Sequence, residues 1–134
     1  MTKVEKIFIS KEALIRQSKD RFVTEHLADF LDEIRLIALS EGKRPTERIG
    51  EFNISPRGHT KIRIAWHREG EDIYIDDFLY HKGEDYVDKW NIKAAKGKIT
   101  RKDYSSYTKL PISALLNDNK PDVESYKNFL RQAS

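Results

Sequence analysis

TKIRIAWHREGEDIYIDDFLYHKGEDY, the segment from Thr60 to Tyr86, carries the clearest structural pattern in the chain. Apolar and polar residues alternate in its first half, which is the period of a β-strand. Gly70 can take the positive φ of a tight turn. A second strand from Ile73 to Tyr80 is rich in β-branched and aromatic residues. The segment predicts a hairpin with a core face of Ile62, Ile64 and Trp66, and an outward face of Lys61, Arg63, Ala65 and His67.

The bulk composition predicts one domain spanning residues 1–134, with room for a single modest core. Hydrophobic residues make up 38% of the chain and charged residues 35%, so the surface is heavily charged. No apolar run has the length of a membrane span, and the first residues lack the apolar block of a signal peptide. We therefore expect a cytoplasmic protein without a membrane partner. The absence of cysteine excludes disulfides, thiolate catalysis and Cys-built zinc sites.

The net charge of +3 is mild, but its distribution is uneven. Between Asp88 and Lys102 there are six cations and one acid. Such a surplus attracts a polyanion, although a solvated helix surface is the commoner explanation of a basic run. Lys93 and Lys96 are the members of this run that we nominate for RNA binding.

The other elements follow from local signals. A short strand from Lys6 to Ile9 precedes Ser10, a good helix N-cap. An apolar stripe from Arg21 to Glu41 predicts one long helix that covers the apolar face of the hairpin. Further along we expect a strand over 49–55, a helix over 85–96 and a last helix that begins at Pro121. The fold class is α+β: a small, mostly antiparallel sheet, N-terminal helices on one face and an additional C-terminal helical segment.

Three segments resemble the RelE/ParE toxin superfamily. Lys6–Leu14 is similar to its opening strand and helix start, and Lys61–Ile64 to its central strand, in which an arginine follows a turn. Tyr74–Tyr80, followed by His81, Lys82 and Tyr86, is similar to its last core strand and its basic, tyrosine-containing end. The resemblance covers about residues 4–95 and leaves about 98–134 as a C-terminal extension.

The resemblance implies a compact microbial toxin whose sheet forms a shallow cleft. Many members cleave messenger RNA on the ribosome without a metal, and others inhibit DNA gyrase. A cognate antitoxin protein normally neutralises the toxin. We therefore expect a metal-independent endoribonuclease of a type II toxin–antitoxin system, with RNA and an antitoxin as partners and no cofactor.

RNA cleavage by internal transesterification needs a base for the 2′-hydroxyl, an acid for the leaving oxygen and cations for the phosphate. Arg63 is the candidate cation, and its alternative role is an exposed strand arginine paired with an acid on the next strand. His81 is the candidate acid or base. Glu47 or Glu51 is a further candidate base, although neither lies in a local motif. The expected RNA-binding residues are Lys61, Lys82, Tyr86, Lys93 and Lys96.

Two other functions stay open at this stage. The first is a non-catalytic module of the same fold that binds nucleic acid or protein, as a degenerate toxin or a gyrase-type poison. Asp76 and Asp77, together with the long C-terminal segment, favour it. The second is a metal nuclease, because five carboxylates occur in fourteen residues; yet on a regular strand Asp76 and Asp77 point to opposite faces. Asp77 would then share a face with Ile73 and Ile75, and it requires a partner or a strand irregularity. We expect His67 at the surface.

Overall fold

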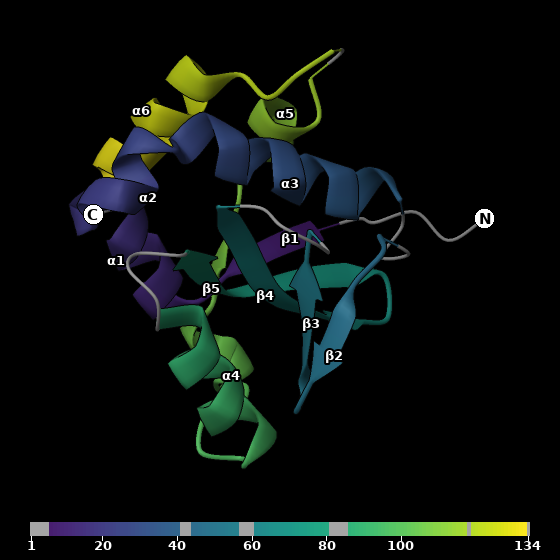
Figure 1. Cartoon of the computed structure of the whole chain (residues 1–134). Helices are drawn as coiled ribbons and strands as arrows, with labels where there is room; N and C mark the ends of the chain where they lie inside the picture. Colours follow the sequence, from purple (N-terminus) through teal and green to yellow (C-terminus); the bar gives the residue numbers. More distant parts are fainter. Residues whose placement is uncertain (1–5, 41–43, 57–60, 81–85, 118, 134) are drawn as a thin grey trace.

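A computed structural model describes residues 6–40, 44–56, 61–80, 86–117 and 119–133, without the side chains of residues 86–89 and 92. Its centre is a six-stranded sheet with the strand order β2-β3-β4-β5-β1-β6 (Figure 1). β1 runs parallel to β5, and the other neighbours pair antiparallel. The strands are β1 (Lys6–Ile9), β2 (Glu47–Ile49), β3 (Phe52–Ser55), β4 (Ile62–Glu69), β5 (Asp72–Tyr80) and β6 (Thr108–Lys109).

The helices occupy both faces of this sheet. In Figure 1, α3 crosses one side of the sheet and α4 lies on the other. The helices are α1 (Lys11–Lys19), α2 (Arg21–Glu25), α3 (Leu27–Leu39), α4 (Tyr86–Ala95), α5 (Ile112–Leu115) and α6 (Val123–Ala133), with a 3₁₀ turn at Tyr104–Ser106. The α+β class, the mostly antiparallel sheet and the C-terminal helices are as predicted.

Several predicted boundaries are wrong. The long N-terminal helix is two helices, because the backbone leaves helical geometry at His26 (φ −112°, ψ 24°). The strand expected over 49–55 is a hairpin, in which Gly50 (φ 59°) makes the turn between β2 and β3. The last helix begins at Val123 rather than Pro121, and the Asp122 carboxylate accepts a hydrogen bond from the Ser125 N–H at 3.1 Å.

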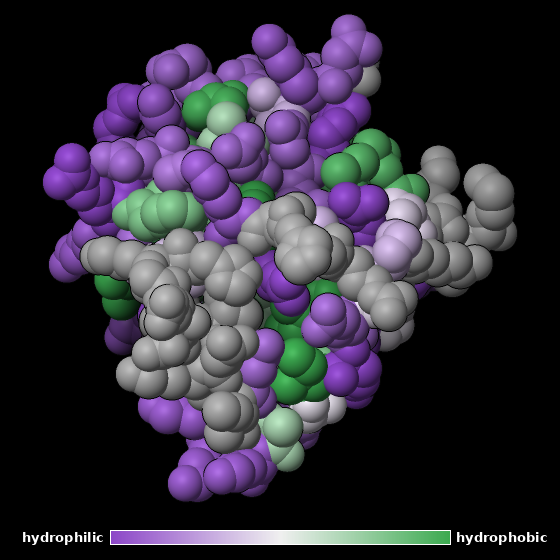
Figure 2. Space-filling view, in the orientation of Figure 1, coloured by the Kyte–Doolittle hydropathy of each residue, from purple (hydrophilic) through white to green (hydrophobic). Residues whose placement is uncertain are grey.

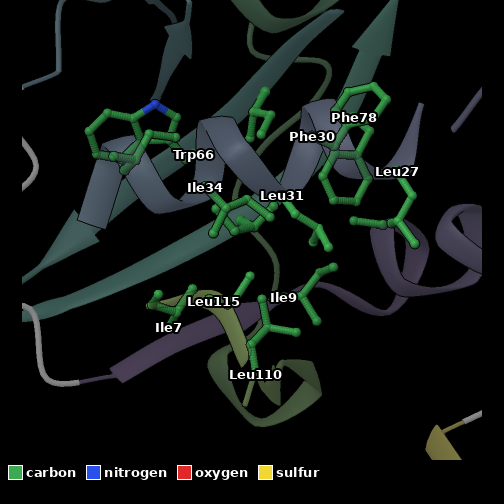
Figure 3. Close-up of a cluster of buried hydrophobic side chains, with 14 of the residues drawn as sticks. Ile7, Ile9, Leu27, Phe30, Leu31, Ile34, Trp66, Phe78, Leu110 and Leu115 are labelled. Atoms are coloured by element: carbon green, nitrogen blue, oxygen red, sulfur yellow. The ribbon is translucent and has the colours of Figure 1, made fainter. Parts of the chain in front are cut away.

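The main core lies between the sheet and α3. Figure 3 shows Phe30, Leu31 and Ile34 of α3 above Ile7 and Ile9 of β1. The C-terminal segment belongs to the same core, because Leu110, Leu115 and Tyr126 are buried in it. The Tyr126 hydroxyl also donates to Gln17 Oε1 at 2.7 Å. The extension predicted from about residue 98 therefore packs into the core through these residues.

The predicted inward residues Ile62, Ile64 and Trp66 all lie in this core. The predicted outward face is not open, however. Ala65 is fully buried with Leu79, Trp90 and Ala94 in a second, smaller cluster under α4. The sheet is therefore covered on both faces, and only part of the second face remains for a functional site.

The surface has the character that the composition predicts. Figure 2 shows a mainly hydrophilic face on which hydrophobic residues form small, separate areas. Among the described residues, none of the helices combines the length and apolarity needed to cross a membrane.

A β-bulge separates the two halves of the β4–β5 ladder. Ala65 pairs with Asp77, but its successor Trp66 pairs with Ile75, so Asp76 has no residue opposite it. A bulge shifts the alternation of side chains by one residue. As a result, Ile75 and Phe78 both face the main core, while Asp76 and Asp77 both line the opposite face. The sequence predicted that Asp77 needs either a partner or a strand irregularity, and this bulge is such an irregularity.

Ser10 connects the first helix to this bulge. Its Oγ accepts a hydrogen bond from the Ala13 N–H at 3.1 Å and donates one to the Asp76 carbonyl oxygen at 2.7 Å. Ser10→Ala removes an N-cap and leaves a buried carbonyl without its donor, so we expect about 1–3 kcal/mol of destabilisation. Urea unfolding measures this, and Ser18→Ala, at an exposed position of α1, is the control. Equal midpoints for the two variants would contradict the role of Ser10.

Candidate functional site

Arg63 and Glu47 are the two predicted catalytic residues that the structure brings together. Arg63 lies on β4 and Glu47 on β2, and the atoms Nη1 and Oε1 are 3.7 Å apart. The Arg63 side chain is 13% exposed and that of Glu47 is 41% exposed. Arg63 is thus held on the face opposite α3, beside a carboxylate. The alternative role for Arg63 was an exposed arginine paired with an acid on the next strand. The structure differs from it, because Arg63 is mostly buried and β3 lies between β2 and β4.

The structure describes only some of the other predicted site residues. Lys61, Lys93 and Lys96 are exposed. His81 and Lys82 lie outside the described residues, and Tyr86 begins α4 with its side chain also outside them. We expect Lys61 and His81 to converge with Arg63 on the same open face of the sheet, and this stays a prediction.

The basic run from Lys89 to Lys102 is partly neutralised. Arg101 Nη1 lies 3.1 Å from Glu69 Oε1, and its Nη2 donates to the Glu51 carbonyl oxygen at 2.9 Å. Lys102 Nζ is 3.9 Å from Glu12 Oε1. These two cations hold the 99–102 segment against the sheet and α1, which leaves Lys93, Lys96 and Lys98 as the described, exposed lysines of the run.

Sequence reasoning missed a second cluster, which surrounds the β5 bulge. A cavity of about 270 Å³ opens there on the face opposite α3. Four separate segments supply its charged side chains and one tryptophan: Glu12, Arg16, Asp76, Asp77, Trp90 and Lys102. The one sequence signal was the pair of adjacent acids inside an apolar strand. Nothing local indicated that α1 and the 99–102 segment would meet them.

Asp77 is a largely buried acid in this cavity. Its Oδ1 is 3.5 Å from Arg16 Nε and accepts a hydrogen bond from the Phe78 N–H at 2.8 Å. Burial raises the pKa of Asp77 to about 6, against the opposing effect of the Arg16 charge. Nearby Glu12 raises this pKa further.

Asp76 is held by a buried network behind the cavity. The His67 Nδ1 atom is 2.7 Å from Asp76 Oδ2, and the Tyr107 hydroxyl donates to Asp76 Oδ1. Burial raises the pKa of Asp76, and the bonds from His67 and Tyr107 oppose this rise. Burial and the neighbouring Asp76 also raise the pKa of the Tyr107 hydroxyl.

The expectation that His67 lies at the surface is wrong. Its side chain is fully buried: Tyr74 stacks on the ring with centroids 5.0 Å apart, and Tyr107 meets both rings edge-on, with its centroid 6.2 Å from that of His67. Within the described part of the chain, His67 Nε2 has no hydrogen-bond partner. Tyr107 comes from the 103–110 region, whose structure the sequence left ambiguous.

The described residues contain no group of three or more His, Asp or Glu side chains that could hold a metal ion. The bulge does place Asp76 and Asp77 on one face, contrary to the regular-strand expectation. However, Asp76 is occupied by His67 and Tyr107, and Asp77 faces Arg16.

Comparisons with known proteins give little guidance. No family model matches the chain, and no solved structure gives a significant match. A 47-residue segment, 35% of the chain, is 40% identical to part of the UDP-N-acetylglucosamine--peptide N-acetylglucosaminyltransferase GtfA subunit of Streptococcus parasanguinis. The match spans 9% of that protein.

The raised pKa of Asp77 predicts a specific pH dependence of stability. From about pH 4 to pH 6 the unfolded chain loses this proton before the folded protein does, so Asp77 lowers the free energy of unfolding as pH rises. We expect Asp77→Asn to remove on the order of 1–3 kcal/mol of this pH-dependent change. Urea unfolding of both proteins at pH 4.5 and pH 7 measures the difference. Parallel pH profiles would contradict the assignment.

Proposed function

We propose that the protein is a toxin-like, metal-independent endoribonuclease of a type II toxin–antitoxin system. The observation that carries the proposal is the juxtaposition of Arg63 and Glu47, 3.7 Å apart on one sheet face. A fixed guanidinium beside a carboxylate supplies two of the functions that RNA transesterification needs, which are phosphate stabilisation and proton abstraction.

The arrangement of the strands supports the same proposal. The three segments that resemble RelE/ParE toxins form the neighbouring strands β4, β5 and β1. The resemblance thus follows a contiguous part of the sheet rather than scattered surface segments. An antitoxin is the expected protein partner.

In the proposed reaction, Glu47 takes the proton of the 2′-hydroxyl and Arg63 binds the scissile phosphate. A separation of 3.7 Å exceeds the roughly 2.7–2.9 Å of a charge-assisted hydrogen bond. A phosphate oxygen can therefore replace the carboxylate as the partner of Arg63. His81 protonates the leaving oxygen, while Lys61, Lys82 and Tyr86 position the RNA strand.

The non-catalytic alternative has one observation in its favour. Arg63 is mostly buried and faces Glu47, as a structural strand arginine does. In that case the fold binds nucleic acid or protein, and the exposed lysines of α4 supply affinity. The cleavage experiment below separates the two functions.

Arg63→Ala removes phosphate stabilisation, so we expect RNA cleavage to slow by about two to three decades. Glu47→Gln keeps the shape of the side chain but removes the base, at a cost of about two to four decades. Cleavage of reporter RNA is measured in the presence of chelator, together with growth on expression without antitoxin. Arg21→Gln changes a highly exposed arginine and is the control.

Full cleavage by both variants would contradict the catalytic assignment. Growth arrest that persists in both variants without RNA cleavage would favour the binding module.

Exposed Lys93, Lys96 and Lys98 are expected to add affinity for RNA without sequence preference. Each phosphate contact contributes about 0.7 to the slope of log K against log salt for single strands. Changing all three to Gln should therefore reduce this slope by about 2. The control changes Lys6, Lys11 and Lys19, which are exposed elsewhere. An unchanged slope would mean that the α4 lysines are only a solvated surface.

A further inference from the structure

We propose that the cavity at the β5 bulge binds a guanine base presented by single-stranded RNA. This inference rests on the proposed function for its biological ligand. The cavity itself is defined by residues that take no part in the Arg63–Glu47 pair.

The size and position of the cavity suit one base. Its volume of about 270 Å³ is just below the roughly 300 Å³ at which small-molecule sites begin, so it accepts a single ring system. It lies on the same side of the sheet as Arg63. Asp77 pairs with Ala65, which follows Arg63 by two residues on β4, or about 7 Å of strand. A base in the cavity can therefore belong to a nucleotide close to the phosphate at Arg63.

The charges of the cavity favour a neutral ligand over a phosphate. Among the described lining residues, Glu12, Asp76 and Asp77 contribute three carboxyl groups, and Arg16 and Lys102 contribute two cations. The cations already face acids, with Arg16 at 3.5 Å from Asp77 and Lys102 at 3.9 Å from Glu12. A phosphate would meet the surplus of carboxylates, whereas a neutral base can hydrogen-bond to both signs of charge.

The donors and acceptors select guanine among the four bases. Carboxylates only accept hydrogen bonds when ionised, and Arg and Lys only donate them. Guanine presents adjacent N1–H and N2–H₂ donors on one edge and the O6 and N7 acceptors on the next. Asp77 matches the donor edge, and Arg16 and Lys102 match the acceptor edge. Adenine and cytosine offer one exocyclic amine, and uracil offers a single ring N–H between two carbonyls.

The walls of the cavity are held in place. Trp90 packs against Phe52 with ring centroids 5.2 Å apart. Trp90 is buried but lines the cavity, so it offers an apolar contact for a base. Behind it, His67 and Tyr107 fix Asp76. A site with locked side chains loses little entropy on binding, which favours recognition of a small ligand.

The test uses the indole N–H signals of the full chain, labelled with ¹⁵N, in two-dimensional NMR. The chain has two tryptophans. Trp90 lines the cavity, whereas Trp66 is in the main core and donates to Ser55 Oγ at 3.0 Å. We expect guanosine to shift the Trp90 signal at a concentration at least tenfold below adenosine, cytidine or uridine, and to leave Trp66 unchanged.

Variants locate the binding. Asp77→Asn should weaken the guanosine response at least tenfold, and the exposed Glu71→Gln should not change it. Lys102→Gln is a second variant that does not endanger folding, since its side chain is 48% exposed. It should weaken the response severalfold. Undiminished binding in both cavity variants would overturn the proposal.

Other outcomes are equally decisive. If no nucleoside shifts the Trp90 signal, the site is wrong. If all four nucleosides shift it at equal concentrations, the preference for guanine is wrong. A response to N-acetylglucosamine but to none of the nucleosides would replace the base with a saccharide. Failure of the two proposals is distinguishable. If guanosine does not shift the Trp90 signal but Arg63→Ala abolishes RNA cleavage, only the guanine site is wrong. If guanosine shifts the signal but Arg63→Ala and Glu47→Gln cleave RNA as well as the wild type, only the catalytic assignment is wrong.

Discussion

The register shift between β4 and β5 is the constraint on which the candidate sites and much of the packing depend. On a regular strand, Asp77 would enter the main core beside Ile75, where an unpartnered carboxylate is costly. The bulge at Asp76 brings Asp77 to the α4 face, beside Asp76, and returns Phe78 to the core. Ser10 bonds the carbonyl oxygen of the bulged residue, so the start of α1 is tied to the same irregularity.

Burying two adjacent acids is unfavourable unless other groups compensate, and three distant parts of the chain do so. Arg16 comes from α1, His67 from β4, and Tyr107 from the segment that follows α4. The C-terminal third therefore does more than lengthen the fold. It supplies Tyr107 to the buried network, and the nearby Lys102 lines the cavity.

The sequence predicted the parts of the fold that local periodicity controls. Alternation placed Ile62, Ile64 and Trp66 in the core, and Ser10 marked the start of α1. Arg63 and Glu47 were also among the catalytic candidates nominated from the sequence. Their proximity, however, depends on the β2–β3 hairpin, which was predicted as one strand. The burial of His67 was not predicted. Tyr74 lies opposite it on the predicted hairpin, but Tyr107 comes from a region that the sequence left ambiguous. The cavity could not be predicted, because it is formed by tertiary contacts and by a bulge. Its one signal in the sequence was the pair of adjacent acids, Asp76 and Asp77.

The two-sided covering of the sheet limits where chemistry can occur. Because α4 buries Ala65 and Leu79, the second face is divided into an Arg63–Glu47 end and a cavity beside the bulge. The first part has a mostly buried cation beside a more exposed carboxylate, and we propose that a phosphate binds there. In the second part, Arg16 faces Asp77 and Lys102 faces Glu12, so the charges oppose one another in pairs. Such a site suits a neutral group that carries hydrogen-bond donors and acceptors on different edges. A nucleotide has both parts, a charged phosphate and a neutral base. This division of one sheet face is therefore the physical argument for the proposal that the two sites belong to one surface for RNA.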